Sequence, residues 1–229
     1  MVAALAARRL GAPGLAIAVG FTALDAEPAP TLTLGEAGLL AGGPSPREWP
    51  GDMFRLLARG RVGVAVTPAQ IDAAGRTNLS GVGPPGRPAV ALPGSRGLPD
   101  HNPSPSSVWY LLPAHSARTL VERVDVVSGP APDAEAGVRR LLSPAGCFTL
   151  RGGRFEADWL APAGEELVAA APGLGIRLGR VPERAAPGPD ALAALRAVDP
   201  HAVRDVEFAP REEAARLWAS AATRERGAA

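Results

Sequence analysis

The sequence predicts an α/β fold, an open and mainly parallel sheet flanked by helices. Three observations predict it. Short apolar runs recur along the chain, helix-like stretches lie between them, and the 27 glycines and 25 prolines fall mostly between the runs. Continuous apolar runs are typical of strands buried on both faces of a parallel sheet. Strands that alternate with helices indicate layers of helices packed on that sheet.

The expected strands are the apolar runs at residues 15–19, 62–66, 108–112, 119–127 and 166–170. Helices are expected at Met1–Leu10, Asp52–Arg59 and Asp133–Leu142, the last with a capping aspartate and two arginines in its final turn. A further stretch, Pro189–Arg226, is expected to be helical in two pieces that meet at Asp199-Pro200. The length favours one sizeable core, so we predict a single domain over residues 1–205 and a helical tail over residues 206–229.

The charge pattern excludes several classes of function. The chain has 24 basic and 23 acidic residues and a formal charge of +1. Such a balance, without long blocks of one sign, argues against a nucleic-acid or membrane-surface partner. All basic residues other than histidine are arginine, which excludes Schiff-base catalysis and a phosphate-binding loop with its lysine.

Cysteine and histidine are too few to suggest a metal or a disulfide. Cys147 has no cysteine to pair with, and the three histidines lack the spacing of metal ligands. We interpret Cys147 as a small core side chain. The cytosol is the expected compartment, since the apolar run at residues 15–24 is interrupted by Gly20 and Thr22 and indicates a strand rather than a signal peptide.

A glycine-rich turn at residues 92–97 is the first candidate for chemistry. Gly94 and Gly97 surround Arg96, so backbone N–H groups there could face an anion or a thioester oxygen. The same pattern also occurs in ordinary turns. His115 and Arg118 are candidates either for ligands or for polar caps, and Asp125 requires a polar partner within its apolar run.

Six segments in the central part of the chain suggest a family. They are Ala69-Gln70-Ile71-Asp72, Gly75-x-x-Asn78, Gly94-x-Arg96-Gly97-x-Pro99, His115-x-x-Arg118, Val124-Asp125-x-Val127-Ser128 and Asp199-Pro200. In this order they resemble the β subunits of class I CoA-transferases, above all those of glutaconate CoA-transferase and of related enzymes of bacterial steroid-ring degradation. The resemblance covers most of residues 10–205.

The resemblance implies an open α/β fold, a homologous α subunit as partner, and an active site at the interface between the two. The substrate would be an acyl-CoA, so coenzyme A would enter with the substrate and no cofactor would be bound permanently. Gly94, Ser95, Arg96 and Gly97 would shape the thioester pocket. Gln70 and Asn78 would hydrogen-bond the acyl part.

The chain departs from the family at its nucleophile. Transferases of the family use a β-subunit glutamate at a strand end, and Gly20 stands at that position here. Glu36, in Gly35-Glu36-Ala37-Gly38, imitates another form of the motif and is the alternative nucleophile. The N-terminal region is shorter than in the family, so either Met1 is not the true start or part of the fold has been lost.

Three hypotheses therefore stand. The first is a subunit of a hydrolase or ring-opening enzyme whose catalytic carboxylate comes from the α subunit. The second is a true CoA-transferase that uses Glu36, and the third is a non-catalytic relative that binds CoA or a partner.

Overall fold

The computed structural model describes residues 2–19, 23–24, 50–184, 187–200, 202–207, 209–210, 212–217 and 219–220. These residues form two compact units, Met1–Met53 with Pro187–Ala229, and Phe54–Ala186. Among the described helices, none combines the length and the apolarity that a membrane span requires. Gly20 and Glu36 lie outside the described residues.

The first unit contains two packed helices. Helices α1 (Val2–Leu10) and α6 (Pro189–Val198) contact each other, and Leu5, Ala6, Ile17 and Val198 form a small apolar cluster. The other elements are β1 (Ala18–Val19), β2 (Ala23–Leu24) and the 3₁₀-helix η2 (Val203–Glu207). Residues 212–217 are helical. The expected helix at the N-terminus and the helix break at Asp199 are confirmed, whereas the boundary at residue 205 stays a prediction.

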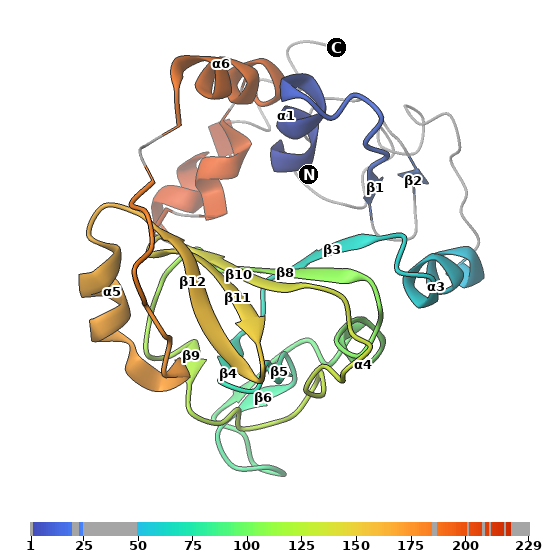
Figure 1. Ribbon diagram of the computed structural model, residues 1–229, viewed down its shortest axis with the longest axis vertical. Coiled ribbons are helices and arrows are strands. Elements are labelled where there is room, and N and C mark those ends of the chain that lie inside the picture. Colours follow the sequence, from blue (N-terminus) through green and yellow to red (C-terminus); the bar gives the residue numbers. More distant parts are fainter. Residues whose placement is uncertain are drawn as a thin grey trace. The chain divides into compact units, whose positions relative to one another are not determined.

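The second unit is built on a five-stranded sheet in the order β12-β11-β10-β8-β3 (Figure 1). Its strands are β3 (Gly63–Val66), β8 (Ser107–Leu111), β10 (Arg139–Ser143), β11 (Gly146–Arg151) and β12 (Arg154–Leu160). β3, β8 and β10 are parallel to one another, and β11 and β12 continue the sheet as antiparallel strands. The predicted α/β class is confirmed, with a parallel part and an antiparallel extension.

The remaining elements of this unit surround that sheet. Three short strands form a second sheet in the order β5 (Thr77–Asn78), β4 (Gln70–Asp72) and β9 (Leu120–Val121). β6 (Gly81–Val82) and β7 (Val90–Ala91) form a hairpin. The helical segments are α3 (Pro50–Ala58), which begins in the first unit, α4 (Leu98–His101), α5 (Gly164–Ala170) and the 3₁₀-helix η1 (Pro172–Leu174).

Two predicted elements are wrong. Residues 166–170, expected as a strand, lie in helix α5, whose residues are mostly good helix formers. The expected helix at Asp133–Leu142 is absent, because Arg139–Ser143 is strand β10. Gly137, just before that strand, lies so close to Pro105 that a β-carbon would be 2.2 Å from its carbonyl oxygen, which fixes the chain against the neighbouring loop.

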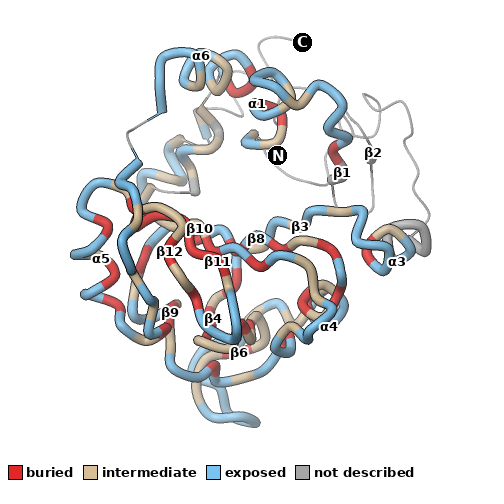
Figure 2. The backbone as a smooth tube through the Cα atoms, viewed as in Figure 1, coloured by how far each residue is buried: buried red, intermediate tan, exposed pale blue. Residues whose placement is uncertain are grey.

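The core of the second unit lies on one face of the main sheet. Val108 and Tyr110 of β8 are buried, whereas Trp109 and Leu111, which alternate with them, are 40% and 38% exposed. Leu141, Phe148 and Phe155 on the neighbouring strands complete the buried face. Figure 2 shows this alternation of buried and exposed positions along the strands. The apolar run at residues 108–112 is thus buried on one face only, not on two as expected.

A buried arginine joins this sheet to the loop after α4. Arg139 is 2% exposed, and its guanidinium donates hydrogen bonds to the carbonyl oxygens of Asn102 (2.6 Å), Ser104 (2.6 Å) and Ser106 (2.6 Å). Burial lowers the pKa of Arg139, against the influence of nearby Tyr110 and Asp133. These hydrogen bonds connect the loop over residues 102–106 to the first residue of β10.

Replacing Arg139 by methionine should therefore destabilise the protein strongly. We expect Arg139→Met to lower the free energy of unfolding by about 3 kcal/mol, because buried carbonyl groups lose their partners. Urea denaturation of the full chain measures this. Arg140→Met is the matched control, since Arg140 is exposed and its side chain makes no hydrogen bond within the described residues. Equal stability of the two variants would contradict this interpretation.

Candidate functional site

Gln70 and Asn78, both predicted to contact the acyl group, are brought together by the small sheet. They are partners in the β4–β5 pairing, and the Asn78 side chain donates to Gln70 Oε1 at 2.7 Å. Gln70 Nε2 donates in turn to Asp125 Oδ2 at 3.0 Å. Gln70 is 5% exposed and Asn78 is fully buried. These two amides face each other and the protein interior.

Asn78 also holds the chain that follows it. Its Oδ1 accepts hydrogen bonds from the backbone N–H groups of Ser80 (2.9 Å) and Gly81 (3.3 Å), and its Nδ2 donates to the Gly81 carbonyl at 2.7 Å. Ser128 Oγ accepts from the N–H of Leu79 at 2.8 Å. Since both ends of the amide are occupied, we interpret Asn78 as a positioning residue for the turn after β5.

Asp125, for which a polar partner was expected, finds its partners in this network. Besides Gln70, its carboxylate accepts a hydrogen bond from the N–H of Gly83 at 2.8 Å. Its own N–H donates to Gln70 Oε1 at 3.0 Å. The segment Val124–Ser128 thereby connects β4, β5 and the start of the β6–β7 hairpin.

Asn102 is a member of this polar network that the sequence analysis missed. Its buried Nδ2 lies within hydrogen-bond distance of the Gly75 carbonyl (3.1 Å) and the Pro130 carbonyl (2.9 Å). Gly129 is adjacent, and a β-carbon there would be 2.9 Å from Asn102 Nδ2. Asn102 therefore joins the loop that Arg139 holds to the turn that contains Gly75. The only sequence signal is its place just after the glycine-rich loop.

The loop Gly94–Gly97, which follows this network along the chain, contains residues with unusual backbone angles. Gly94 has φ of 101°, and Arg96 has φ of 50°, which is uncommon for a residue with a side chain. Gly97 then has φ of −85° and ψ of 3°. A positive φ followed by a negative φ turns successive N–H groups toward one side, as in anion-binding nests. Non-glycine residues in such conformations cluster at functional sites.

Part of the backbone of this loop is available to a ligand. The N–H of Gly94 is already bonded to the Leu79 carbonyl at 3.0 Å, so it cannot serve the thioester as the sequence analysis expected of the whole loop. The N–H groups of Ser95, Arg96 and Gly97 make no hydrogen bond within the described residues. The Arg96 side chain is exposed and likewise has no partner there.

The His101 side chain packs against Gly97 of the same loop. A β-carbon on Gly97 would lie 2.6 Å from Cε1 of the His101 ring, so only glycine allows this contact. Burial lowers the pKa of His101, although Asp100 opposes the shift. The ring is therefore mainly neutral at physiological pH, and its Nδ1 is buried and has no hydrogen-bond partner among the described residues.

His115, in the loop between β8 and β9, and Cys147, in β11, both pack against neighbouring side chains and have structural surroundings. His115 Nδ1 contacts Ser143 Oγ at 2.8 Å, and its ring packs against Phe148. Burial and the neighbouring Asp158 carboxylate raise the pKa of Cys147 to about 11. Cys147 is buried, so its thiol is protonated at neutral pH and lacks the properties of a nucleophile.

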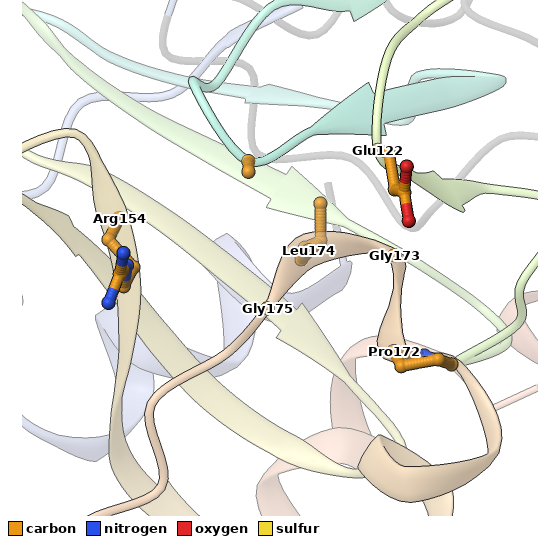
Figure 3. Close-up of a pocket in the computed structure, with 7 residues that line it drawn as sticks. Glu122, Arg154, Pro172, Gly173, Leu174 and Gly175 are labelled. Carbon is orange, nitrogen blue, oxygen red and sulfur yellow. The ribbon is translucent and has the colours of Figure 1, made fainter.

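One hollow of the second unit is lined by residues other than those of the predicted loop. It has a volume of about 480 Å³ and is lined by Ala73, Glu122, Arg154, Pro172, Gly173, Leu174 and Gly175 (Figure 3). None of the predicted site residues that the structure describes lies in it. Nor do the described residues bring three or more histidine, cysteine, aspartate or glutamate side chains together as a metal site would.

We expect Asn78→Ala to loosen the turn that leads toward the loop. Loss of its hydrogen bonds should lower the free energy of unfolding by about 2 kcal/mol and should speed amide exchange over residues 79–97. Hydrogen–deuterium exchange and urea denaturation measure both. Ser95→Ala, which removes no hydrogen bond seen in the structure, should leave both unchanged. Unaltered exchange in Asn78→Ala would show that the network does not hold the loop.

Cys147 should react slowly in the native protein. With its pKa near 11 and its side chain buried, we expect little labelling by iodoacetamide at pH 7.5 and full labelling in urea. The thiolate forms more readily in the unfolded chain, so the contribution of this group to stability is lost as pH rises from about 8.5 toward 11. Fast native labelling would contradict the buried environment.

Comparison with known proteins finds similar sequences and similar solved structures. No family model matches the chain. The cholesterol ring-cleaving hydrolase IpdB subunit of Mycobacterium tuberculosis is 38% identical over 141 residues, which cover 53% of this chain and 56% of the relative. The chain thus matches little more than half the length of these curated relatives.

Solved structures cover more of the chain. The decarboxylase AibA/AibB matches with 29% identity and a TM-score of 0.80, over 89% of this chain and 85% of that one. IpdAB of Rhodococcus jostii RHA1 matches with 28% identity and a TM-score of 0.73, over 90% and 86%. Glutaconate coenzyme A-transferase from Acidaminococcus fermentans, at 20% identity and a TM-score of 0.76 over 87% and 84%, shares the fold. The chain is therefore similar in sequence to the IpdB subunits over about half its length, and it shares the fold of the AibA/AibB, IpdAB and glutaconate coenzyme A-transferase structures.

Proposed function

We propose that this chain is the β-type subunit of a heteromeric enzyme that acts on an acyl-CoA thioester by hydrolysis or ring opening. A homologous α subunit supplies the catalytic carboxylate. The observation that carries the proposal is the loop Gly94–Gly97, in which the N–H groups of residues 95–97 and the Arg96 guanidinium have no partner among the described residues and no carboxylate is present. The similarity to IpdB subunits of cholesterol ring-cleaving hydrolases supports the same class of reaction.

The geometry suits the stabilisation of charge. In hydrolysis, the oxygen of water bonds to the thioester carbon, the carbon–sulfur bond breaks and coenzyme A leaves as a thiol. Negative charge develops on the carbonyl oxygen, and preorganised N–H donors stabilise it. The N–H groups of Ser95, Arg96 and Gly97 provide such donors, and the carboxylate of the partner takes the proton from water.

Arg96 would orient the substrate. Its guanidinium can form two parallel hydrogen bonds with a carboxylate or a phosphate, and both groups are available on acyl-CoA substrates. The residues from Gly81 to Leu98 include no aspartate or glutamate, so no acidic side chain within this segment competes for Arg96. Gln70 and Asn78 would act through the loop and not on the acyl group, because they are buried in their mutual hydrogen bonds.

The assembled enzyme tests the proposal. The chain is co-expressed with an α-like subunit encoded beside it, purified through a tag on this chain, and assayed for CoA release from a panel of acyl-CoA esters with and without acetate or succinate. We expect turnover without an acceptor, seen either as free CoA from thioester hydrolysis or, for ring opening, as an acyl-CoA product that has gained one water and kept its thioester. Acceptor-dependent formation of acetyl-CoA or succinyl-CoA would favour a transferase that uses Glu36, and no conversion of any acyl-CoA would favour a non-catalytic relative.

Removal of the Arg96 side chain should reduce activity of that complex. We expect Arg96→Ala to lower kcat/KM by about 10- to 100-fold, since a hydrogen bond to a charged group contributes about 1.5–3 kcal/mol. Arg96→Lys should restore part of the loss, because lysine keeps the charge but not the planar fork. Arg140→Ala, at an exposed position of the main sheet, should leave kcat/KM unchanged. An unchanged kcat/KM in Arg96→Ala would remove Arg96 from the site.

A further inference from the structure

The β6–β7 hairpin directly precedes the candidate loop and projects from the second unit (Figure 1). Gly81 pairs with Ala91 and Val82 with Val90. Every residue from Pro84 to Ala91 is exposed, and Val90 is 51% exposed. After the hairpin, the N–H of Gly94 donates a hydrogen bond to the Leu79 carbonyl, which joins the end of the hairpin to the residue after β5.

The base of the hairpin is anchored in the buried polar network. Asp125 accepts from the N–H of Gly83, Asn78 holds Gly81, and the N–H of Leu92 donates to the Ser80 carbonyl at 3.1 Å. The hairpin also has internal contacts, since a β-carbon on Gly81 would lie 3.1 Å from Cβ of Pro88. Both its base and its strands are thereby held in a defined geometry.

The surface of the hairpin is apolar and basic. It presents Val90 together with Pro84, Pro85 and Pro88, and Val127, near its base, is 54% exposed. Arg87 at the tip is exposed and makes no ion pair within the described residues. Exposed apolar groups on a preorganised, proline-rich element are typical of binding surfaces, because little conformational entropy is lost on association.

We propose that this hairpin is a docking arm for the α-type partner, a proposal that rests on the function proposed above. The partner would contact Val90 with an apolar surface and Arg87 with a carboxylate. The segment from Gly81 to Leu98 carries two arginines and no acidic residue, so it suits a partner surface that carries carboxylates. The chain continues from the arm into the loop, so docking there would bring the partner's carboxylates beside Arg96.

Three substitutions in the full chain test the arm. Val90→Asp places a charge in the proposed apolar contact, and Arg87→Glu reverses the proposed charge interaction. Val138→Asp is the matched control, because Val138 is 43% exposed in the same unit but distant in sequence from the hairpin. Binding of each variant to the purified α-like subunit is measured by biolayer interferometry, and urea denaturation confirms that each variant folds. CoA release by the wild-type complex is measured in parallel.

We expect Val90→Asp and Arg87→Glu to raise the Kd for the α-like subunit by at least about 10-fold. Val138→Asp should leave this Kd within about twofold of the wild-type value. Wild-type affinity in both hairpin variants, with an active wild-type complex, would overturn the arm and leave the proposed function intact. Loss of self-association, rather than of partner binding, would overturn it by identifying a second copy as the occupant. If the wild-type chain bound no α-like subunit, the arm and the proposed function would both fail.

Discussion

The buried guanidinium of Arg139 is the constraint on which the candidate site depends. A charge inside a protein must be surrounded by hydrogen-bond partners, and Arg139 finds them in the carbonyls of the loop over residues 102–106. That loop positions Asn102, and Asn102 in turn holds the turn around Gly75 and the segment at Pro130. The main sheet, which supplies Arg139, thus fixes a polar region outside its own core.

From this fixed point, the hydrogen bonds lead to the glycine-rich loop. Gln70, Asn78 and Asp125 satisfy one another, so their role is to hold backbone in place. The loop that follows differs, since Arg96 has a positive φ, and the N–H groups of residues 95–97 and the Arg96 guanidinium have no partner in the part of the chain that the structure describes. A rigid polar base beneath an unsatisfied loop is the arrangement expected where a ligand and a second chain complete a site.

The sequence predicted the α/β class, helices α1, α3 and α6, and the central segments near the site. It failed where tertiary contacts override local preference: Arg139 and Arg140, read as the end of a helix, belong to a strand because Arg139 is needed inside. It also assigned Gln70 and Asn78 to the substrate, since residue type alone cannot show that two amides face each other. Asn102 was missed because its role depends on segments far apart in the chain.

The central claim is that this chain orients and stabilises the reaction while the nucleophile or base comes from elsewhere. Intact mass spectrometry of this chain, after the assembled complex has been incubated with acyl-CoA, tests it most directly. The account predicts that the acyl-CoA is either hydrolysed to free CoA or opened to a product that keeps its thioester, and that this chain remains unmodified. A CoA adduct on this chain, sensitive to hydroxylamine and located at Glu36, would contradict it and identify the chain as the nucleophilic subunit of a transferase.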